Sequence, residues 1–426
     1  MFTLFQTFFT KKTAKKTKRV YLDYAGATPI SDVALNALLQ SKTVYGNPSA
    51  IHKEGVDAGR LLDKARALSA KILNAHAYEI YFMATGTESC NTGILGTYNA
   101  FIQEHQGEIP HILTTPIEHP AVLEPIKKLE SEKKVTVTYV PVYEDGVVKL
   151  NDIREALKEN TILVSVMYAN NEIGTLQPVK EIGRCIEEWK KERNRTHTEY
   201  PYFHIDACQA GNYCNLDVIR LRAHLLTVNS SKVYGPKGCA LLYKREGTSV
   251  HGITYGGGQE RGLRSGTEDA SLAYAFSRAL EESQMMREKE SVRLRYLRDY
   301  CKKRLEEEIK DVVFYGAFDA YKHTLEEGDS KHIKHELRLP NNINCRVPKI
   351  RSEEMILRLD ALGFACSHKS ACASKESDGS YVIEALGATK EESLENIRIT
   401  FGRATTKKDI ENLVRAMTSI AEKYRD

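Results

Sequence analysis

The chain has 426 residues, of which 42% are hydrophobic and 28% charged, which is enough for about two or three domains with a real core. Its 61 Lys and Arg residues against 57 Asp and Glu leave a net charge of +4, so no strong field favours nucleic acid or an anionic membrane. Nine cysteines without a C-x-x-C pair exclude a small disulfide framework and fit a reducing compartment, where some thiols stay free and reactive.

The first 22 residues contain no acid and place four phenylalanines ahead of a lysine cluster from Lys11 to Arg19. Such a segment is compatible with an organelle presequence, a membrane-surface helix or a solvated arm. We favour the arm, because transit peptides are usually rich in Arg and Ser rather than Lys. No apolar stretch approaches the roughly 18 residues of a membrane span, which predicts a soluble protein.

From Val20 onward, short apolar runs alternate with longer amphipathic stretches. The runs predicted as strands are 79–84, 111–114, 135–142, 162–168, 202–205, 225–228 and 240–243. Helix-length segments separate most of them, which predicts a mostly parallel sheet covered on both faces. Ligands bound by such sheets collect at the carboxyl ends of the strands.

The pattern changes past about residue 270. A long charged helix is predicted to about Glu308, followed by short strands at 312–315, 342–346 and 397–401 and a last helix from Thr406. These elements predict a smaller α+β domain, and the polar stretch 321–338 predicts a surface excursion. We expect an N-terminal arm and the start of the small domain in 1–28, a large domain in 29–270 and the small domain in 271–426.

Two strand ends carry residues suited to a cofactor. Residues 83–89, Met-Ala-Thr-Gly-Thr-Glu-Ser, run from a strand into a helix whose free amides could bind a phosphate. An ordinary N-cap with Glu88 in the first turn is the alternative. Asp206 ends another apolar strand and could hold the protonated nitrogen of a pyridine ring, unless it is a turn aspartate.

Three further side chains are candidates for chemistry. Lys232 lies between a buried strand and a Gly-Pro turn, where desolvation would lower its pKa and favour Schiff-base formation; a solvated surface lysine is the alternative. His119 could stack on a flat ring or merely lie near an N-cap. Arg398, on a short apolar strand, could bind a carboxylate or form a structural ion pair.

Residues 365–374, Ala-Cys-Ser-His-Lys-Ser-Ala-Cys-Ala-Ser, bring cysteines next to positive charge. Neighbouring cations lower a thiol pKa, so Cys372 is a candidate nucleophile. A metal site formed by Cys366, His368 and Cys372 is the rival, but no fourth ligand is evident and the spacing matches no common zinc module. We expect no resident metal, although Cys372 could transiently bind an iron-sulfur cluster.

Ten motifs lie in register between about Tyr21 and Tyr424. They are Tyr21-Leu-Asp-Tyr-Ala, Gly46-Asn-Pro-Ser, Gly86-Thr-Glu-Ser, Glu118-His, Asn170-Asn-Glu-Ile-Gly, Asp206-Ala-Cys-Gln, Lys232-Val-Tyr-Gly-Pro-Lys-Gly, Gly256-Gly-Gly-Gln-Glu-Arg-Gly-Leu-Arg-Ser-Gly-Thr, Ser370-Ala-Cys-Ala-Ser and Arg398. In this order they resemble the cysteine desulfurases of the NifS/IscS type, class V aminotransferase-like enzymes that use pyridoxal phosphate. The resemblance implies the α/β fold of type I, with a mostly parallel seven-stranded sheet in the large domain and a smaller α+β domain.

The resemblance also implies a role for each matching residue. Lys232 would bind the cofactor covalently and later move the substrate's α-proton, and Cys372 would be the nucleophile that takes up sulfur. The expected cofactor contacts are His119 on the ring, Asp206 at the ring nitrogen, Asn171 and Gln209 near the phenolic oxygen, and Gly86, Thr87 and Ser231 at the phosphate. Thr267 would reach the phosphate of the other subunit of a homodimer, and Asn47 and Arg398 would bind the substrate carboxylate.

The implied activity converts L-cysteine into L-alanine and leaves a persulfide on Cys372. A sulfur acceptor protein, such as an iron-sulfur scaffold or a tRNA thiolase, would receive this sulfur, without direct binding of nucleic acid or membrane. The alternatives are another class V enzyme, such as an aminotransferase or a selenocysteine lyase, and a catalytically silent scaffold. The Ser-Ala-Cys-Ala-Ser context of Cys372 argues against another class V enzyme. The presence of Cys372 together with Lys232, Asp206 and Arg398 argues against a catalytically silent scaffold.

Several positions depart from the family pattern. Ser231 and Asn229 stand where relatives usually have His and Ser, and a neutral hydroxyl binds phosphate less strongly, so cofactor affinity is expected to be reduced. Gln259 and Lys369 stand where many relatives have His and Gly, and Lys369 adds a charge that favours a thiolate at Cys372. This divergence favours a bacterial cytoplasm over a mitochondrion.

Overall fold

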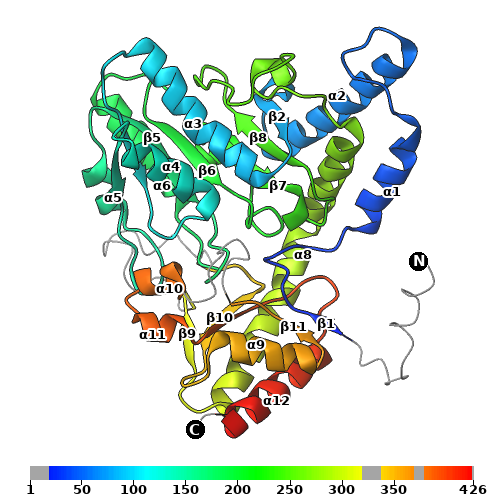
Figure 1. Cartoon of the computed structure of the whole chain (residues 1–426), viewed down its shortest axis with the longest axis vertical. Helices are drawn as coiled ribbons and strands as arrows, with labels where there is room; N and C mark the ends of the chain where they lie inside the picture. Colours follow the sequence, from blue (N-terminus) through cyan, green and yellow to red (C-terminus); the bar gives the residue numbers. More distant parts are fainter. Residues whose placement is uncertain (1–18, 319–336, 369–378, 425–426) are drawn as a thin grey trace, which may run out of the picture.

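The computed structural model describes residues 19–318, 337–368 and 379–424. A seven-stranded sheet with its helices forms one part of the molecule, and a three-stranded sheet with its helices forms the other (Figure 1). Residues 1–18 of the predicted arm, most of the polar excursion 321–338, Lys369 and Cys372 lie outside the described residues. In the described part of the chain, no helix combines the length and the apolar character needed to cross a membrane.

The large sheet confirms the predicted mostly parallel, seven-stranded architecture. Its strand order is β2-β8-β7-β6-β5-β3-β4, and β8 alone runs antiparallel to its neighbours. The strands are β2 Ile80–Met83, β3 His111–Thr114, β4 Thr136–Tyr139, β5 Thr161–Met167, β6 Tyr202–Asp206, β7 Leu225–Asn229 and β8 Ala240–Lys244. All residues of β5 and β6 are buried, as expected for strands covered on both faces.

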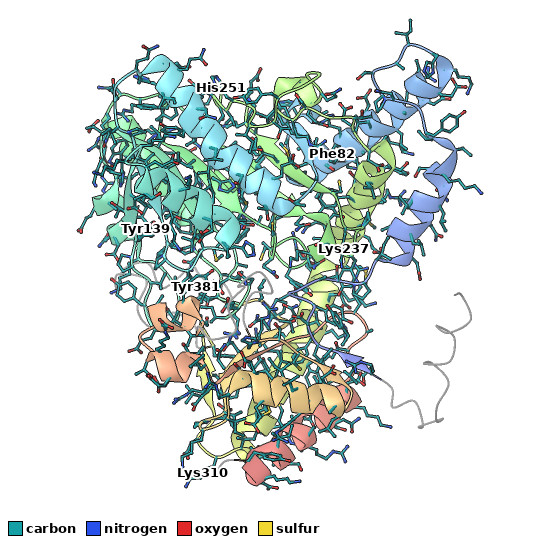
Figure 2. The ribbon with its side chains drawn as sticks, in the orientation of Figure 1. Phe82, Tyr139, Lys237, His251, Lys310 and Tyr381 are labelled. Atoms are coloured by element: carbon teal, nitrogen blue, oxygen red, sulfur yellow. The ribbon has the colours of Figure 1, made fainter. Side chains whose placement is uncertain are left out.

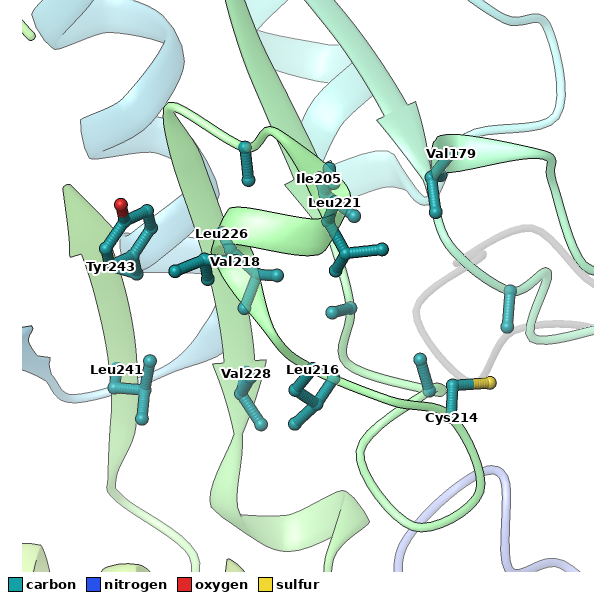
Figure 3. Packing of buried hydrophobic residues seen from close by; sticks show 14 of the residues in the cluster. Val179, Ile205, Cys214, Leu216, Val218, Leu221, Leu226, Val228, Leu241 and Tyr243 are labelled. Atoms are coloured by element: carbon teal, nitrogen blue, oxygen red, sulfur yellow. The ribbon is translucent and has the colours of Figure 1, made fainter. Parts of the chain in front are cut away.

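Helices cover both faces of this sheet because successive side chains of a strand point to opposite sides. Ile112 and Leu225 pack with α3 and α4, whereas the adjacent Leu113 and Leu226 pack in the cluster on the other face, with α2, α6, α7 and the start of α8 (Ala270–Glu308). Figure 3 shows part of this second cluster, around Leu226. The helices are α1 Asp32–Gln40, α2 Lys53–Leu73, α3 Gly86–Glu104, α4 Pro120–Ser131, α5 Leu150–Ala156, α6 Val179–Glu192 and α7 Val218–Leu221.

The second part of the molecule is built on two small sheets. One has the antiparallel order β12-β10-β9, and the other pairs β1 with β11 in parallel. Their strands are β1 Val20–Tyr21, β9 Val313–Tyr315, β10 Asn342–Arg346, β11 Phe364–Ala365 and β12 Asn396–Thr400. The accompanying helices are α9 Ser352–Ala361, α10 Tyr381–Ala385, α11 Lys390–Ser393 and α12 Lys407–Tyr424.

One helix, α8 Ala270–Glu308, runs through both parts (Figure 1). Phe276 and Leu280 in its first half belong to the core of the large sheet. Leu294 and Leu305 in its second half belong to the core of the small sheets. The predicted long charged helix is thus confirmed, and it connects two hydrophobic cores.

A buried lysine, Lys190, lies near the C-terminal end of α6, away from the strand ends that carry the candidate site residues. Lys190 is 3% exposed, and its Nζ lies 3.2 Å from Nε2 of His224. The Phe203 amide donates to Nδ1 of His224, so the imidazole proton is on Nε2, which donates to the His197 carbonyl at 3.0 Å. Burial, followed by the charge of Arg245, lowers the pKa of Lys190 to about 7.

Lys190→Met is therefore expected to stabilise the protein at pH 7. The unfolded chain binds the lysine proton up to a pKa near 10.5, so folding at pH 7 costs about 1.4 kcal/mol per unit of pKa lowering. Hydrogen bonds lost in the variant offset about 2 kcal/mol, which leaves a gain of about 2 to 3 kcal/mol.

Urea unfolding measures this effect. The wild-type protein binds fewer protons than its unfolded chain between pH 7 and 10.5, so its stability rises with pH and the difference from the variant narrows. The exposed neighbour Lys191→Met is the control and should change little. A variant that is less stable than wild type at pH 7, by an amount independent of pH, would contradict this account of Lys190.

Candidate active site

A cavity of about 170 Å³ lies at the carboxyl ends of the central strands. It brings together nine of the site residues predicted from the sequence, from the large sheet, its loops and β12. They are Gly86, Thr87, His119, Asn171, Asp206, Gln209, Ser231, Lys232 and Arg398. Ala25, Gly26, Ala121, Met167, Ala169, Cys208 and Asn229 complete the lining. The position agrees with the rule that open α/β sheets bind ligands at their carboxyl edge.

Asp206 is the last residue of β6 and is only 7% exposed. Its Oδ1 accepts a hydrogen bond of 3.0 Å from the amide of Cys208, which fixes the carboxylate in the turn after the strand. Burial and the charge of Asp206 raise the pKa of the Cys208 thiol well above its ordinary value, so the thiol stays protonated. Sequence reasoning assigned no role to Cys208, although its place two residues after Asp206 puts it in the same turn.

Lys232 ends a short 3-10 turn, Ser230–Lys232, that directly follows β7. The side-chain amide of Asn212 donates to the Lys232 carbonyl at 2.6 Å and holds this backbone in place. Nζ of Lys232 donates to the carbonyls of Ala25 and Gly26, at 2.7 and 2.6 Å. The amine is thus directed into the cavity, against a loop near the N-terminus that the sequence analysis did not associate with it.

The first turn of α3 forms one wall of the cavity. Gly86 is its first residue, and a Cβ built there would lie 3.1 Å from Sγ of Cys208 and 3.3 Å from Nδ2 of Asn229. A larger residue would therefore crowd these two side chains, and the amides of a first helical turn bind anionic groups. Glu88 in the same turn does not oppose an anion, because Nε of Arg264 donates to its carboxylate at 3.1 Å.

His119 is the N-cap of α4, and its Nδ1 accepts a hydrogen bond of 3.1 Å from the Ala121 amide. Burial lowers the pKa of the His119 imidazole, so the ring is neutral at neutral pH. The preceding Glu118 is completely buried, and its Oε1 accepts from the Met167 amide at 2.9 Å. Burial raises the pKa of Glu118 to about 8, which keeps this carboxyl protonated at pH 7 beside the neutral ring.

The sequence left open whether Arg398 binds a carboxylate ligand or forms a structural ion pair, and the structure is compatible with both. Its side chain on β12 lines the cavity and also forms an ion pair, with Nη2 at 2.7 Å from Oδ1 of Asp23. Nη1 donates to the carbonyl of Asn171 at 3.0 Å. These contacts fix the guanidinium at the edge of the cavity opposite the large sheet.

Two predicted residues lie outside this cavity. Asn47 and Thr267 are both exposed, and Oδ1 of Asn47 accepts from the Ser49 amide at 2.9 Å. Cys372 is outside the described residues. Within residues 19–318, 337–368 and 379–424, no group of three or more His, Cys, Asp and Glu side chains could hold a metal ion.

The described residues on either side of Cys372 contact the site. Ser367 pairs with Arg398 through backbone hydrogen bonds of 2.6 and 3.3 Å. The hydroxyl of Tyr381, labelled in Figure 2, donates to the Glu118 carbonyl at 2.7 Å. Ser367 therefore lies beside cavity-lining Arg398, and Tyr381 lies beside the loop that carries cavity-lining His119.

The fold and this arrangement of side chains place the chain in a known class. Residues 20–413 match the model of the Aminotransferase class-V family, and the chain belongs to that family. It is 36% identical to the cysteine desulfurase IscS of Dictyoglomus turgidum, over 96% of this chain and 96% of that protein. The resemblance to the NifS/IscS type is thereby confirmed.

Solved structures agree with this assignment. The chain resembles a NifS-like protein with a TM-score of 0.82 at 29% identity, covering 95% of this chain and 99% of that one. It also resembles SspA in complex with cysteine, with a TM-score of 0.71 at 28% identity, covering 89% of this chain and 98% of that one. These proteins and the present chain share the α/β fold with a mostly parallel sheet.

Proposed function

We propose that this chain is a cysteine desulfurase that uses pyridoxal 5'-phosphate to convert L-cysteine into L-alanine and a persulfide on Cys372. One observation carries the proposal. The Lys232 amine, the Asp206 carboxylate and the Arg398 guanidinium converge on a single cavity, in a chain whose relatives are cysteine desulfurases. An amine, an acid and a carboxylate receptor are the groups that amino-acid chemistry on a pyridine cofactor needs.

The residues of the cavity fit this cofactor. Gly86 provides a cradle that a Cβ would fill, at a helix N-terminus suited to a phosphate. The neutral His119 ring supplies a flat surface, and buried Asp206 supplies a carboxylate for a protonated ring nitrogen. Pyridoxal phosphate, when bound, supplies an electron sink that makes the carbon-sulfur bond of the substrate labile once the α-proton has left.

The protein's own side chains would bind the cofactor and the substrate and would move the proton. Gly86, Thr87 and Ser231 would hold the phosphate, with Asn171 and Gln209 near the phenolic oxygen. Lys232 would anchor the cofactor and then take the α-proton of the substrate on its Nζ, after the substrate amine has displaced it. Arg398 would bind the substrate carboxylate and orient the sulfur. Asn47, the other predicted carboxylate ligand, is exposed and does not line the cavity of its own chain.

Sulfur leaves the substrate in a displacement at Cys372. The Cys372 thiolate would attack the substrate sulfur, so that a sulfur-sulfur bond forms as the carbon-sulfur bond breaks. The electron pair of the broken bond stays with the carbon fragment, which is protonated and released as alanine. The persulfide then passes to an acceptor protein, such as an iron-sulfur scaffold or a tRNA thiolase.

The proposal also includes the assembly and organisation of the protein. Thr267 is exposed and lies outside the cavity of its own chain, which supports a homodimer in which it reaches the phosphate of the second copy. A stable, fully active monomer in sedimentation experiments would contradict this. A domain division at 1–28, 29–270 and 271–426 and a location in a bacterial cytoplasm remain predictions.

The decisive assay mixes the protein with pyridoxal phosphate, L-cysteine and dithiothreitol, and measures alanine and sulfide. The proposal expects the two products in equal amounts. Amino transfer from cysteine to a 2-oxo acid without sulfide would identify an aminotransferase, and turnover confined to L-selenocysteine would identify a lyase. Absence of all turnover in cofactor-loaded protein would leave the silent scaffold as the better description.

A further inference from the structure

Asp23 lies at the edge of the cavity and has no role in the proposed reaction. Its Oδ1 is 2.7 Å from Nη2 of Arg398, and the two side chains are 24% and 2% exposed. A Cβ at Gly26 would lie only 2.3 Å from Oδ2 of Asp23, so the glycine makes room for this carboxylate. Because Gly26 itself lines the cavity, the Asp23 carboxylate lies immediately behind the cavity wall.

Backbone pairing holds Asp23 in this position. Leu22 donates to the Ala365 carbonyl at 2.9 Å, and its own carbonyl accepts from the Thr400 amide at 2.8 Å. The hydroxyl of Thr400 accepts from the Ala25 amide at 3.0 Å. Arg398 and Thr400 are two residues apart on β12 and share a face of that strand, so these contacts place Asp23 beside the guanidinium.

Arg398 keeps donors for a second carboxylate. A guanidinium has five N–H groups, of which one donates to Asp23 and one to the carbonyl of Asn171. Nε of Arg398 is buried and has no hydrogen-bond partner among the residues that the structure describes. The Arg398–Asp23 pair carries no net charge, so an incoming anion gains less than it would at an unpaired arginine.

We infer that Asp23 is a specificity-determining residue, which shares Arg398 with the substrate carboxylate and disfavours ligands that carry a second anionic group. The inference rests on the proposed function, in which Arg398 binds the carboxylate of cysteine. Asp23 repels a bound anion across a short distance, because its side chain is only 24% exposed and is paired with the same guanidinium. Amino acids with neutral side chains are then preferred over those with a carboxylate or sulfinate side chain.

Asp23→Asn tests the charge alone, because the amide oxygen can still accept from Nη2 of Arg398. In the holoenzyme, KM for L-cysteine should fall by about fivefold and kcat should stay within about twofold. Inhibition by maleate, a simple dicarboxylate, should strengthen by about tenfold or more. A higher KM with unchanged inhibition by maleate would show that Asp23 only orients Arg398, and would overturn the inference.

Maleate binding gives a readout that does not depend on turnover. A ligand that binds the folded state raises the melting temperature, and the rise should be larger in Asp23→Asn than in wild type. Gly26→Ala should act in the same direction, because its Cβ displaces the Asp23 carboxylate without removing the charge. Asp360→Asn is the matched control, because Asp360 pairs with Arg19 on the exposed surface away from the cavity.

The two proposals fail in different ways. If wild-type holoenzyme makes no alanine from cysteine, the proposed function is wrong, while maleate binding still decides the part played by Asp23. If wild type turns over cysteine but both cavity variants bind maleate as wild type does, the inference about Asp23 alone is wrong.

Discussion

Lys232→Ala is expected to abolish alanine and sulfide production, with a loss of at least about a thousandfold, because one side chain both anchors the cofactor and moves the α-proton. The Lys232 amine already points into the cavity, where the carbonyls of Ala25 and Gly26 accept its protons. Mass spectrometry after borohydride reduction measures the anchoring directly. The wild-type chain should gain the mass of the reduced cofactor, and the variant should not.

Lys237→Ala is the matched control for this experiment. Lys237 lies five residues further along the chain, is exposed and is not among the cavity-lining residues (Figure 2). Its replacement should leave both the mass gain and the activity unchanged. Cofactor mass retained on the Lys232→Ala chain would assign the anchor to another lysine and would remove the basis of the proposed reaction.

Cys372→Ser is expected to abolish sulfide release while leaving the cofactor's absorbance, and its change on addition of cysteine, as in wild type. The reason is chemical: a serine hydroxyl stays protonated at neutral pH and does not attack sulfur, whereas a thiolate does. A sulfide assay and an absorbance titration on the same sample separate the two steps.

Cys366→Ser provides the control in the same segment. Burial raises the pKa of the Cys366 thiol far above its ordinary value, so this cysteine is not expected to act as a nucleophile. The Cys366 variant should retain sulfide production. Full activity in Cys372→Ser together with its loss in Cys366→Ser would exchange the two assignments.

Much of the fold could be predicted from the sequence because the strands of the large sheet are near-continuous apolar runs. The ranges 111–114 and 342–346 coincide with β3 and β10. The prediction for 135–142 is too long, since β4 ends at Tyr139 although apolar residues continue. β1 and β11 were missed because each has two residues, too few to show any periodicity.

The site was predictable where the residues follow one strand each, as Asp206 and Lys232 do. Contacts between distant segments were not predictable. Asp23 reaches Arg398 only because the chain near residue 20 pairs with β11 and β12, and no local pattern around Asp23 indicates that pairing. The carbonyls of Ala25 and Gly26 at Lys232 depend on the same long-range contact.

The continuous helix α8 has a consequence for how substrate enters. Its 39 residues extend about 58 Å. One end packs in the core of the large sheet, whose β7 precedes Lys232, and the other end packs in the core of the small sheets, where β12 carries Arg398. A sharp bend in α8 would break main-chain hydrogen bonds in the middle of the helix. The distance between the two halves of the active site is therefore fixed by this helix. Cysteine should therefore arrive by displacement of side chains and short loops at the rim, without a large rotation of one half against the other.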